Sequence, residues 1–202
     1  MDNNTITAGV LALQGSFLEH RLVLEKMGIH TIEVRKPCQL NLIQGIIIPG
    51  GESTTMGKLL NSGEMMAPLR ELISRGVPAM GTCAGMILLS GNISGGILDQ
   101  PSLGLLNIDI SRNGYGRQKE SFEGDFPITD IGGGSFHGVF IRAPIINKLH
   151  NGIRVMATFG GRPVAVRQKN ILATSFHPEL TADDRIHKYF IEMIKEYMGK
   201  ND

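Results

Sequence analysis

Cysteine is nearly absent from this chain, with only Cys38 and Cys83 in 202 residues. Two cysteines cannot build the disulfide framework of a small secreted domain, and a chain of this length does not need one. A surplus of one charge is also absent, because 20 Lys and Arg stand against 19 Asp and Glu, for a net charge of +1. This balance argues against nucleic acid, an anionic membrane or a polyacidic partner as the ligand.

Long apolar runs are absent too. None approaches the ~18 residues of a membrane-spanning helix, and Met1 to Thr5 lacks the positive charges that begin a secretory signal. We therefore expect a protein without a membrane segment that works in the cytoplasm. The hydrophobic share of 42% is enough for a core, and the length favours a single domain over residues 1–202.

Glycine, in contrast, is abundant, at 26 of 202 residues, which is about twice the usual share of roughly 7%. The glycines follow no Gly-X-Y period and are accompanied by only 9 prolines, so neither a collagen-like nor a low-complexity chain is indicated. Their number instead indicates tight turns and close approaches of the backbone.

Short apolar runs alternate with helical patterns through the first half of the chain. The predicted strands are 9–13, 30–34, 46–48 and 77–80, and the predicted helices are 16–27, 54–60, 65–75 and 86–89. Such alternation predicts an α/β fold with a mostly parallel sheet covered by helices on both faces. From about Ile97 the runs shorten and turns multiply, which predicts a mixed or antiparallel extension containing strands 164–166 and 171–174 and a closing helix over 183–198.

A nucleophile elbow is indicated at Gly81-Thr82-Cys83-Ala84-Gly85, between a predicted strand and a predicted helix. The glycines suit a sharp turn in which a Cβ would collide with neighbouring strands. The amino end of the following helix would favour a thiolate at Cys83. On this motif alone, a small buried hydrophobic cysteine is an equally good interpretation.

A base and its orienting group are offered by His177-Pro178-Glu179. On an extended segment, His177 and Glu179 would face the same way, so that the carboxylate could fix the tautomer of the imidazole. A surface histidine beside an exposed glutamate is the usual meaning of such a pair. Its position after a predicted strand favours the functional interpretation, because sites in open α/β sheets gather at the carboxyl ends of strands.

A third candidate segment is Pro49-Gly50-Gly51-Glu52-Ser53-Thr54. Its glycines could direct backbone N–H groups at an oxyanion, while Ser53 or Thr54 could cap the following helix. The spacing argues against a phosphate-binding P-loop and favours an anion or oxyanion site, because five residues separate Gly51 from Gly57 and Lys58 is followed by Leu59.

These segments, in this order, resemble the class I (triad-type) glutamine amidotransferases and, more narrowly, the glutaminase subunits of pyridoxal 5′-phosphate synthases. The narrower resemblance rests on blocks at 9–15, 49–55, 112–118, 121–123, 140–144 and 175–180. Single blocks are weak, but together they run from Gly9 to Leu180 and are highly specific.

The resemblance implies a flavodoxin-like fold that hydrolyses glutamine to glutamate and ammonia. It implies that Cys83 attacks the amide, His177 transfers protons and Glu179 orients His177. The implied oxyanion donors are Gly50, Gly51 and Ala84, the implied glutamine-binding residues are Gly51, Glu52, Ser53, Arg112, Ile141 and Arg142, and Gln14 is implied near the pocket or the partner.

The resemblance also implies a partner, a (β/α)₈-barrel synthase subunit whose dodecameric core is surrounded by glutaminase subunits and which consumes the ammonia. It implies no cofactor, and the histidines show no metal-ligand spacing with either cysteine, so we expect no metal. Two alternatives remain: the glutaminase of another pathway, such as histidine or anthranilate synthesis, and a catalytically silent scaffold. The blocks at 112–118 and 140–144 argue against the first, and an intact Cys83, His177 and Glu179 against the second.

Overall fold

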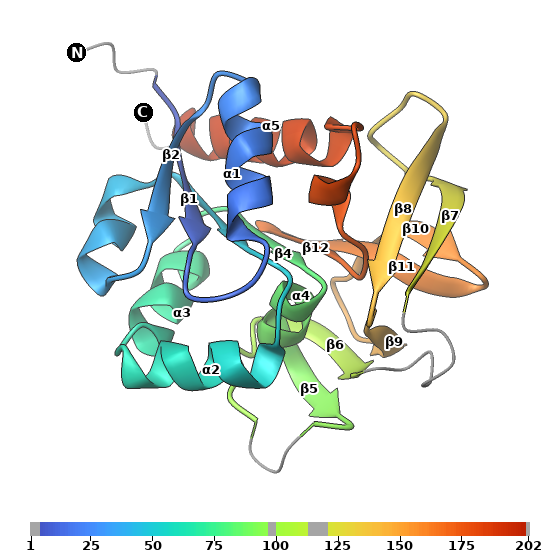
Figure 1. Ribbon diagram of the computed structural model, residues 1–202, viewed down its shortest axis with the longest axis horizontal. Coiled ribbons are helices and arrows are strands. Elements are labelled where there is room, and N and C mark those ends of the chain that lie inside the picture. The colour runs from blue at the N-terminus through green and yellow to red at the C-terminus, as the bar shows by residue number, and fades with distance from the viewer. Residues whose placement is uncertain (1–4, 97–99, 113–120, 201–202) are drawn as a thin grey trace.

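The computed structural model describes residues 5–96, 100–112 and 121–200. At its centre is a seven-stranded sheet in the order β10-β11-β12-β4-β3-β1-β2 (Figure 1). The parallel strands are β1 (Thr7–Leu11), β2 (His30–Val34), β3 (Gly45–Ile48), β4 (Ala79–Thr82) and β12 (Ile171–Thr174). β10 (Arg154–Phe159) and β11 (Arg162–Gln168) extend the sheet with antiparallel pairing. The predicted α/β class, with its mixed extension, is confirmed.

Helices cover both faces of this sheet (Figure 1). α1 (Phe17–Lys26) and α5 (Arg185–Met198) pack on one face, and α2 (Ser53–Ser62), α3 (Met66–Ser74) and α4 (Ala84–Leu89) on the other. Each face has its own hydrophobic cluster, and successive residues of β1 serve both: Val10 joins the α1–α5 side and Leu11 the α2–α3 side. This alternation is the geometry of a strand buried on both faces.

The second half of the chain adds two smaller sheets. β5 (Ser90–Ser94), β6 (Leu106–Ser111) and β9 (Ile145–Leu149) form one, and β7 (Ser121–Pro127) and β8 (Ser135–Ile141) form an antiparallel hairpin. Gly132, Gly133 and Gly134 lie in the connection of that hairpin with φ of 67°, 80° and 77°. The glycine triplet therefore serves a turn that needs the left-handed region three times in succession.

Aromatic side chains hold the hairpin against the main sheet. The Phe122 and Phe140 rings stack with centroids 4.5 Å apart, and the Phe126 ring meets the edge of Phe176 at 5.2 Å. Phe176 precedes His177 in the chain, so this packing ties the end of β8 to the segment after β12.

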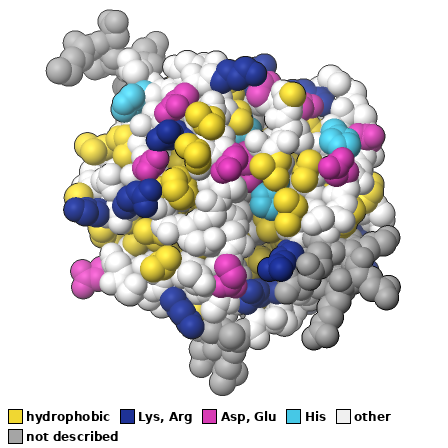
Figure 2. Space-filling model, in the orientation of Figure 1, with side chains coloured by type: hydrophobic (Ala, Val, Ile, Leu, Met, Phe, Trp, Pro, Cys, Tyr) yellow, Lys and Arg dark blue, Asp and Glu magenta, His cyan; other side chains and the backbone are white. Residues whose placement is uncertain are grey.

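Some predicted boundaries were wrong by two residues. The first strand ends at Leu11 rather than at 13, and β4 spans Ala79–Thr82 rather than 77–80, because apolar runs continue into loops that are themselves buried. Short 3₁₀ helices at Pro37–Leu42 (η1) and Pro178–Leu180 (η2) were not predicted, and Cys38 lies exposed in η1. None of the helices in the described ranges combines the length and apolarity of a bilayer span. Positive and negative side chains are interspersed over the face in Figure 2, in keeping with the balanced charge.

Candidate active site

One pocket lies at the carboxyl ends of the parallel strands. In the order β2-β1-β3-β4-β12, the chain adds β2 on one side of β1 and adds β3, β4 and β12 on the other side. Open α/β sheets leave a crevice at such a switch point, which here lies between β1 and β3. Gln14 follows β1, Gly50 follows β3, Cys83 follows β4 and His177 follows β12, and all four line a cavity of about 410 Å³. The topology thus brings together segments that are up to 163 residues apart (177 − 14).

Cys83 occupies a strained turn between β4 and α4, with φ 49° and ψ −105°. A Cβ on Gly85 would lie 1.9 Å from the Ile48 carbonyl oxygen, and one on Gly81 would lie 2.5 Å from Leu89 Cδ1. The predicted collision with a neighbouring strand is confirmed for Gly85, which meets β3, whereas the atoms that exclude a Cβ at Gly81 belong to α4. Cys83 is buried, at 5% exposed, but lines the pocket, as a nucleophile elbow requires.

His177 and Glu179 are in contact, with His177 Nδ1 2.7 Å from Glu179 Oε1. The expectation of an extended segment was wrong, because Pro178–Leu180 forms η2 and His177 is its cap. Proline at the first position of this turn has the φ of a helix start, so the tight turn, rather than strand alternation, brings the two side chains together. Glu179 lies behind the imidazole and does not line the pocket.

The titration of this pair favours the charged forms. Burial disfavours the imidazolium of His177, but hydrogen bonding and charge at Cys83 and Glu179 outweigh burial and raise its pKa to about 10. Burial likewise opposes ionisation of Glu179, but the facing His20, the hydrogen bond from His177 and that from Ser16 outweigh it and lower the Glu179 pKa to about 2. The geometry therefore supports an imidazolium held by a buried carboxylate.

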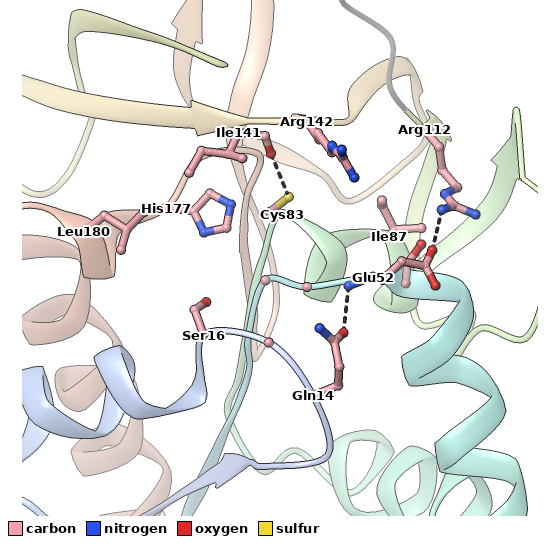
Figure 3. Close-up of a pocket in the computed structure, with 14 residues that line it drawn as sticks. Gln14, Ser16, Glu52, Cys83, Ile87, Arg112, Ile141, Arg142, His177 and Leu180 are labelled. Atoms are coloured by element: carbon pink, nitrogen blue, oxygen red, sulfur yellow. Dashed lines mark hydrogen bonds and ion pairs between the residues drawn. The ribbon is translucent and has the colours of Figure 1, made fainter. Parts of the chain in front are cut away.

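The end of β8 forms the wall of the pocket beside the thiol (Figure 3). The Cys83 Sγ–H donates to the Ile141 carbonyl oxygen at 3.5 Å. The next residue, Arg142, has a φ of 48°, in the left-handed region that non-glycine residues rarely adopt. Backbone strain thus occurs on both sides of the sulfur, at Cys83 and at Arg142.

An ion pair marks the opposite end of the pocket (Figure 3). Arg112 Nη2 lies 2.6 Å from Glu52 Oε1. Glu52 also accepts from the backbone N–H groups of Thr54 and Thr55. It therefore caps α2, and the predicted cap by Ser53 or Thr54 was wrong, because the longer carboxylate reaches both N–H groups. Partial burial opposes ionisation, but the bonds from Thr55 and Thr54 and the Arg112 charge lower the Glu52 pKa to about 2.

Gly50 and Gly51 lie so close to neighbouring side chains that a residue with a Cβ would not fit at either position. A Cβ on Gly50 would lie 2.3 Å from His177 Cε1, and one on Gly51 would lie 2.6 Å from Gln14 Oε1. The loop after β1 holds this segment: Ser16 N–H donates to the Gly50 carbonyl at 3.0 Å, and Glu52 N–H donates to Gln14 Oε1 at 2.7 Å. Gln14 thus positions the glycine segment.

The structure brings most of the predicted site residues into this one pocket. Those that line it are Gln14, Gly50, Gly51, Glu52, Ser53, Cys83, Arg112, Ile141, Arg142 and His177. Ala84 does not line it, being the first residue of α4 and 1% exposed. Of the block at 112–118, residues 113–118 lie outside the described residues.

Sequence reasoning missed several residues in and behind the pocket. Ser16, Ile87 and Leu180 line it, and His20, Thr82 and His187 lie buried behind it. One signal was available: Ser16, His20 and Leu24 are spaced by four, which places polar groups on the buried face of a helix. Among the described residues, no group of three or more His, Cys, Asp or Glu side chains has the arrangement of a metal site.

This fold and pocket agree with the comparisons. The chain belongs to the SNO glutamine amidotransferase family, which matches residues 10–196. Known members of similar sequence carry a more specific name. "Pyridoxal 5'-phosphate synthase subunit PdxT" of Moorella thermoacetica is 52% identical over 92% of this chain and 98% of its own length. The protein of the same name from Pelotomaculum thermopropionicum is 53% identical over 91% of this chain and 93% of its own.

Solved structures agree on the architecture. A crystal structure of a glutamine amidotransferase matches with a TM-score of 0.88 and 48% identity, covering 93% of this chain and 98% of that one. A putative GMP synthase protein from Thermoplasma acidophilum matches with a TM-score of 0.71 at 16% identity, covering 98% of both chains. The second likeness extends to the fold alone.

Proposed function

We propose that this chain hydrolyses L-glutamine to L-glutamate and ammonia with Cys83, His177 and Glu179, and passes the ammonia to a separate pyridoxal 5′-phosphate synthase subunit. The observation that carries the proposal is the meeting of a strained cysteine and a carboxylate-held imidazole in one pocket. Membership of a glutamine amidotransferase family supports the substrate.

The chemistry follows from the positions of these groups. The Cys83 sulfur, having lost its proton to His177, attacks the side-chain amide carbon of glutamine and forms a C–S bond. The C–N bond then breaks as the His177 imidazolium gives its proton to the departing nitrogen, so ammonia leaves and a thioester remains. Water, deprotonated by His177, attacks the thioester carbon and releases glutamate and the thiol. Glu179 stabilises the imidazolium formed in each cycle.

Backbone N–H groups are proposed to hold the oxyanion of the tetrahedral intermediates. Gly50 approaches the His177 ring, and Gly51 the Gln14 side chain, closely enough to exclude a Cβ, and Ala84 N–H follows the nucleophile. Such donors are effective because they need not reorganise when charge develops.

The charged end of the pocket is proposed to hold the backbone groups of glutamine. Glu52 suits its α-ammonium, whereas Arg112 and Arg142 suit its α-carboxylate. Gly51, Ser53 and Ile141 would complete the contacts. The Glu52–Arg112 pair would open or share its bonds when the zwitterion enters, because both side chains line the cavity.

A synthase partner is supported by the names of the relatives and by the rim of the pocket. Leu180 and Ile141 are 44% and 38% exposed beside the cavity, so a docked protein could cover apolar surface there. We propose the (β/α)₈-barrel synthase subunit, in a dodecameric core, as that protein. A cytoplasmic location stays a prediction.

The triad is tested by replacing each cysteine in turn. Cys83→Ala should lower glutamate release, measured with the synthase subunit present, by on the order of 10³-fold or more. Cys38→Ala is the matched control, because Cys38 is exposed in η1, and it should keep the wild-type rate. Hydrolysis that survived in Cys83→Ala would show that the triad assignment is wrong, whereas a wild-type chain that released no glutamate would indicate a silent scaffold.

The partner is tested separately. Mixed with glutamine and a pyridoxal 5′-phosphate synthase subunit, the chain should co-migrate with that subunit on size exclusion and hydrolyse glutamine faster. Absence of both effects would favour the glutaminase of another ammonia-using pathway, such as histidine or anthranilate synthesis.

A further inference from the structure

Behind the pocket, buried polar side chains from three elements meet at His20, which faces Glu179. His20 lies on α1, Thr82 at the end of β4 and His187 on α5, and each is 0% exposed. α1 and α5 share one face of the sheet (Figure 1), and His20 Nδ1 is 2.9 Å from His187 Nε2. None of the three lines the pocket, so the proposed steps assign them no role. Burying polar groups is costly unless they bond one another, so the cluster requires a physical reason.

The contacts of His20 select its tautomer. Its Nε2 lies 3.0 Å from Thr82 Oγ1 and 3.2 Å from Glu179 Oε2. A bare Nε2 lone pair would face the carboxylate oxygen and be repelled, so Nε2 carries the proton. Nδ1 is then the acceptor, and His187 Nε2–H donates to it. The result is a directed chain of N–H groups from His187 through His20 toward the Thr82 and Glu179 oxygens.

Glu179 uses its two oxygens differently. Oε1 accepts from His177 Nδ1 and from the Ser16 hydroxyl, both at 2.7 Å. Within the described residues, Oε2 is buried and no donor meets full hydrogen-bond geometry with it, so the His20 Nε2–H is the group that faces it. A buried carboxylate with one side uncompensated would rotate or take up a proton.

Both histidines behind the carboxylate are held neutral. Burial lowers the pKa of His20, aided by the His177 charge and opposed by those of Glu179 and Glu19. Burial also lowers the pKa of His187 to about 3, with the His20 charge adding to the effect and that of Glu179 opposing it. Near neutral pH, His20 and His187 therefore act on their neighbours as neutral hydrogen-bond donors and acceptors with a fixed orientation, rather than as positive charges.

We propose that His20 is a positioning residue, which keeps the Glu179 carboxylate ionised and turned toward His177. In this arrangement His187 maintains the tautomer of His20 whose Nε2–H lies against both Thr82 Oγ1 and Glu179 Oε2. The inference rests on the triad proposed above, and it adds a second layer of groups contributed by α1 and α5.

A kinetic test compares three substitutions at position 20 in the full chain with the synthase subunit present. His20→Leu should lower kcat about 10- to 100-fold and leave the KM for glutamine nearly unchanged, because His20 does not line the pocket. His20→Gln should regain most of kcat, since its amide nitrogen reaches near the Nε2 position. His20→Asn, of similar polarity, reaches only the Nδ1 position and should stay low.

A matched control and a measurement independent of turnover complete the design. His150→Gln, at an exposed histidine paired with Asp109, should behave as wild type. In the wild type, burial lowers the pKa of His177, but Cys83 and Glu179 outweigh burial and raise it to about 10. In ¹⁵N-labelled protein without a partner, the ring nitrogens of His177 should therefore titrate at a lower pH in His20→Leu and His20→Asn than in the wild type. His20→Gln should restore the wild-type midpoint.

These readouts separate the inference from the function on which it rests. A wild-type chain that hydrolyses no glutamine would overturn the proposed function, while the His177 titration would still test the role of His20. Equal kcat and equal midpoints in the Gln and Asn variants, or a Leu variant like wild type, would overturn the positioning role. If His20→Leu does not fold, as judged by thermal unfolding, the comparison of kcat and of the His177 midpoint between His20→Gln and His20→Asn tests the positioning role.

Discussion

The backbone of Cys83 has a positive φ, and its neighbours explain how a non-glycine residue tolerates it. Such a conformation costs about 1–3 kcal/mol unless surrounding structure imposes it. Here Cys83 N–H donates to the Thr174 carbonyl at 2.8 Å, and Gly85 lets α4 press against the end of β3. The position of the sulfur and the strain at Cys83 therefore depend on Gly85, which does not line the pocket.

Gly85→Ala should destabilise the fold by roughly 1–3 kcal/mol, because its Cβ would overlap the backbone oxygen of Ile48. Urea unfolding followed by circular dichroism measures the change. Gly91→Ala is the matched control, since the nearest atom to its Cβ would be 3.5 Å away. Equal midpoints for the two variants would contradict the steric account of the elbow.

Arg112 makes contacts that a lysine cannot reproduce. Its guanidinium reaches Glu52 Oε1 at 2.6 Å and Gln100 Oε1 at 2.8 Å with different nitrogens. Arg112→Lys should raise the KM for glutamine about tenfold or more, with a smaller effect on kcat, because a point charge replaces a planar fork. Steady-state glutaminase kinetics measure this. Arg75→Lys, at an exposed pair with Glu71, should leave KM unchanged, and a KM unchanged in both variants would remove Arg112 from the binding site.

At the scale of elements, the β7–β8 hairpin connects an aromatic cluster to the thiol. Phe140 is fully buried and is followed by Ile141, whose carbonyl accepts from Cys83. The Phe140 ring packs on Phe122, Phe159 and Phe176. The position of the Ile141 carbonyl therefore depends on the ring packing of the residue before it.

Phe140→Leu should lower both stability, by about 1–2 kcal/mol, and kcat, because the smaller side chain leaves a cavity into which the end of β8 can shift. Thermal unfolding and hydrogen exchange of the β8 amides measure the two effects. Phe17→Leu, a half-buried residue of α1 outside this ring cluster, is the control. If the β8 amides of Phe140→Leu exchanged at the wild-type rate, and faster exchange were confined to α1, the cluster would not hold the hairpin.

At the scale of the whole molecule, buried ionisable groups link stability to pH in opposite directions. Burial is the main cause that lowers the pKa of His187 to about 3 in the folded chain. Below about pH 6.5 the unfolded chain therefore binds a proton at His187, whereas the folded chain does not. Stability from this group is present above that pH and is lost as the pH falls. The pKa of His177 is raised to about 10, chiefly by Cys83 and Glu179 against burial, so its contribution is present below pH 6.5 and is lost as the pH rises toward 10.

We therefore expect maximal stability near pH 6.5. Toward pH 4.5 the loss from His187 is up to roughly 1 kcal/mol for each pH unit, and His20, whose pKa burial also lowers, adds to it. Below that range Glu179, whose pKa the facing His20 and His177 lower to about 2 against burial, adds to the loss. Chemical denaturation across pH 4.5 to 9 measures the curve. His187→Leu should flatten the acid limb only, and an unchanged acid slope in that variant would contradict the assignment.

Most of the parallel core could be predicted, because buried strands such as 46–48 are continuous apolar runs and their helices end in glycine. The strands of the second half could not be predicted one by one. β7 alternates half-buried and exposed residues, and its partner and sheet depend on contacts with β8 and the phenylalanine cluster rather than on a local pattern. That residues 1–202 form one domain stays a prediction.

The residue types of the site were determined by the sequence itself: a cysteine between two glycines, a His-Pro-Glu run and a Gly-Gly-Glu turn are local signals whose chemistry depends on neighbours a few positions away. Only the tertiary structure decided that η2, not a strand, joins His177 to Glu179, that Glu52 caps α2 while pairing with Arg112, and that His20 and His187 stand behind the carboxylate. The physical reason is distance along the chain. His20 and His187 are 167 residues apart, and their contact exists only because α1 and α5 pack side by side on the same face of the sheet.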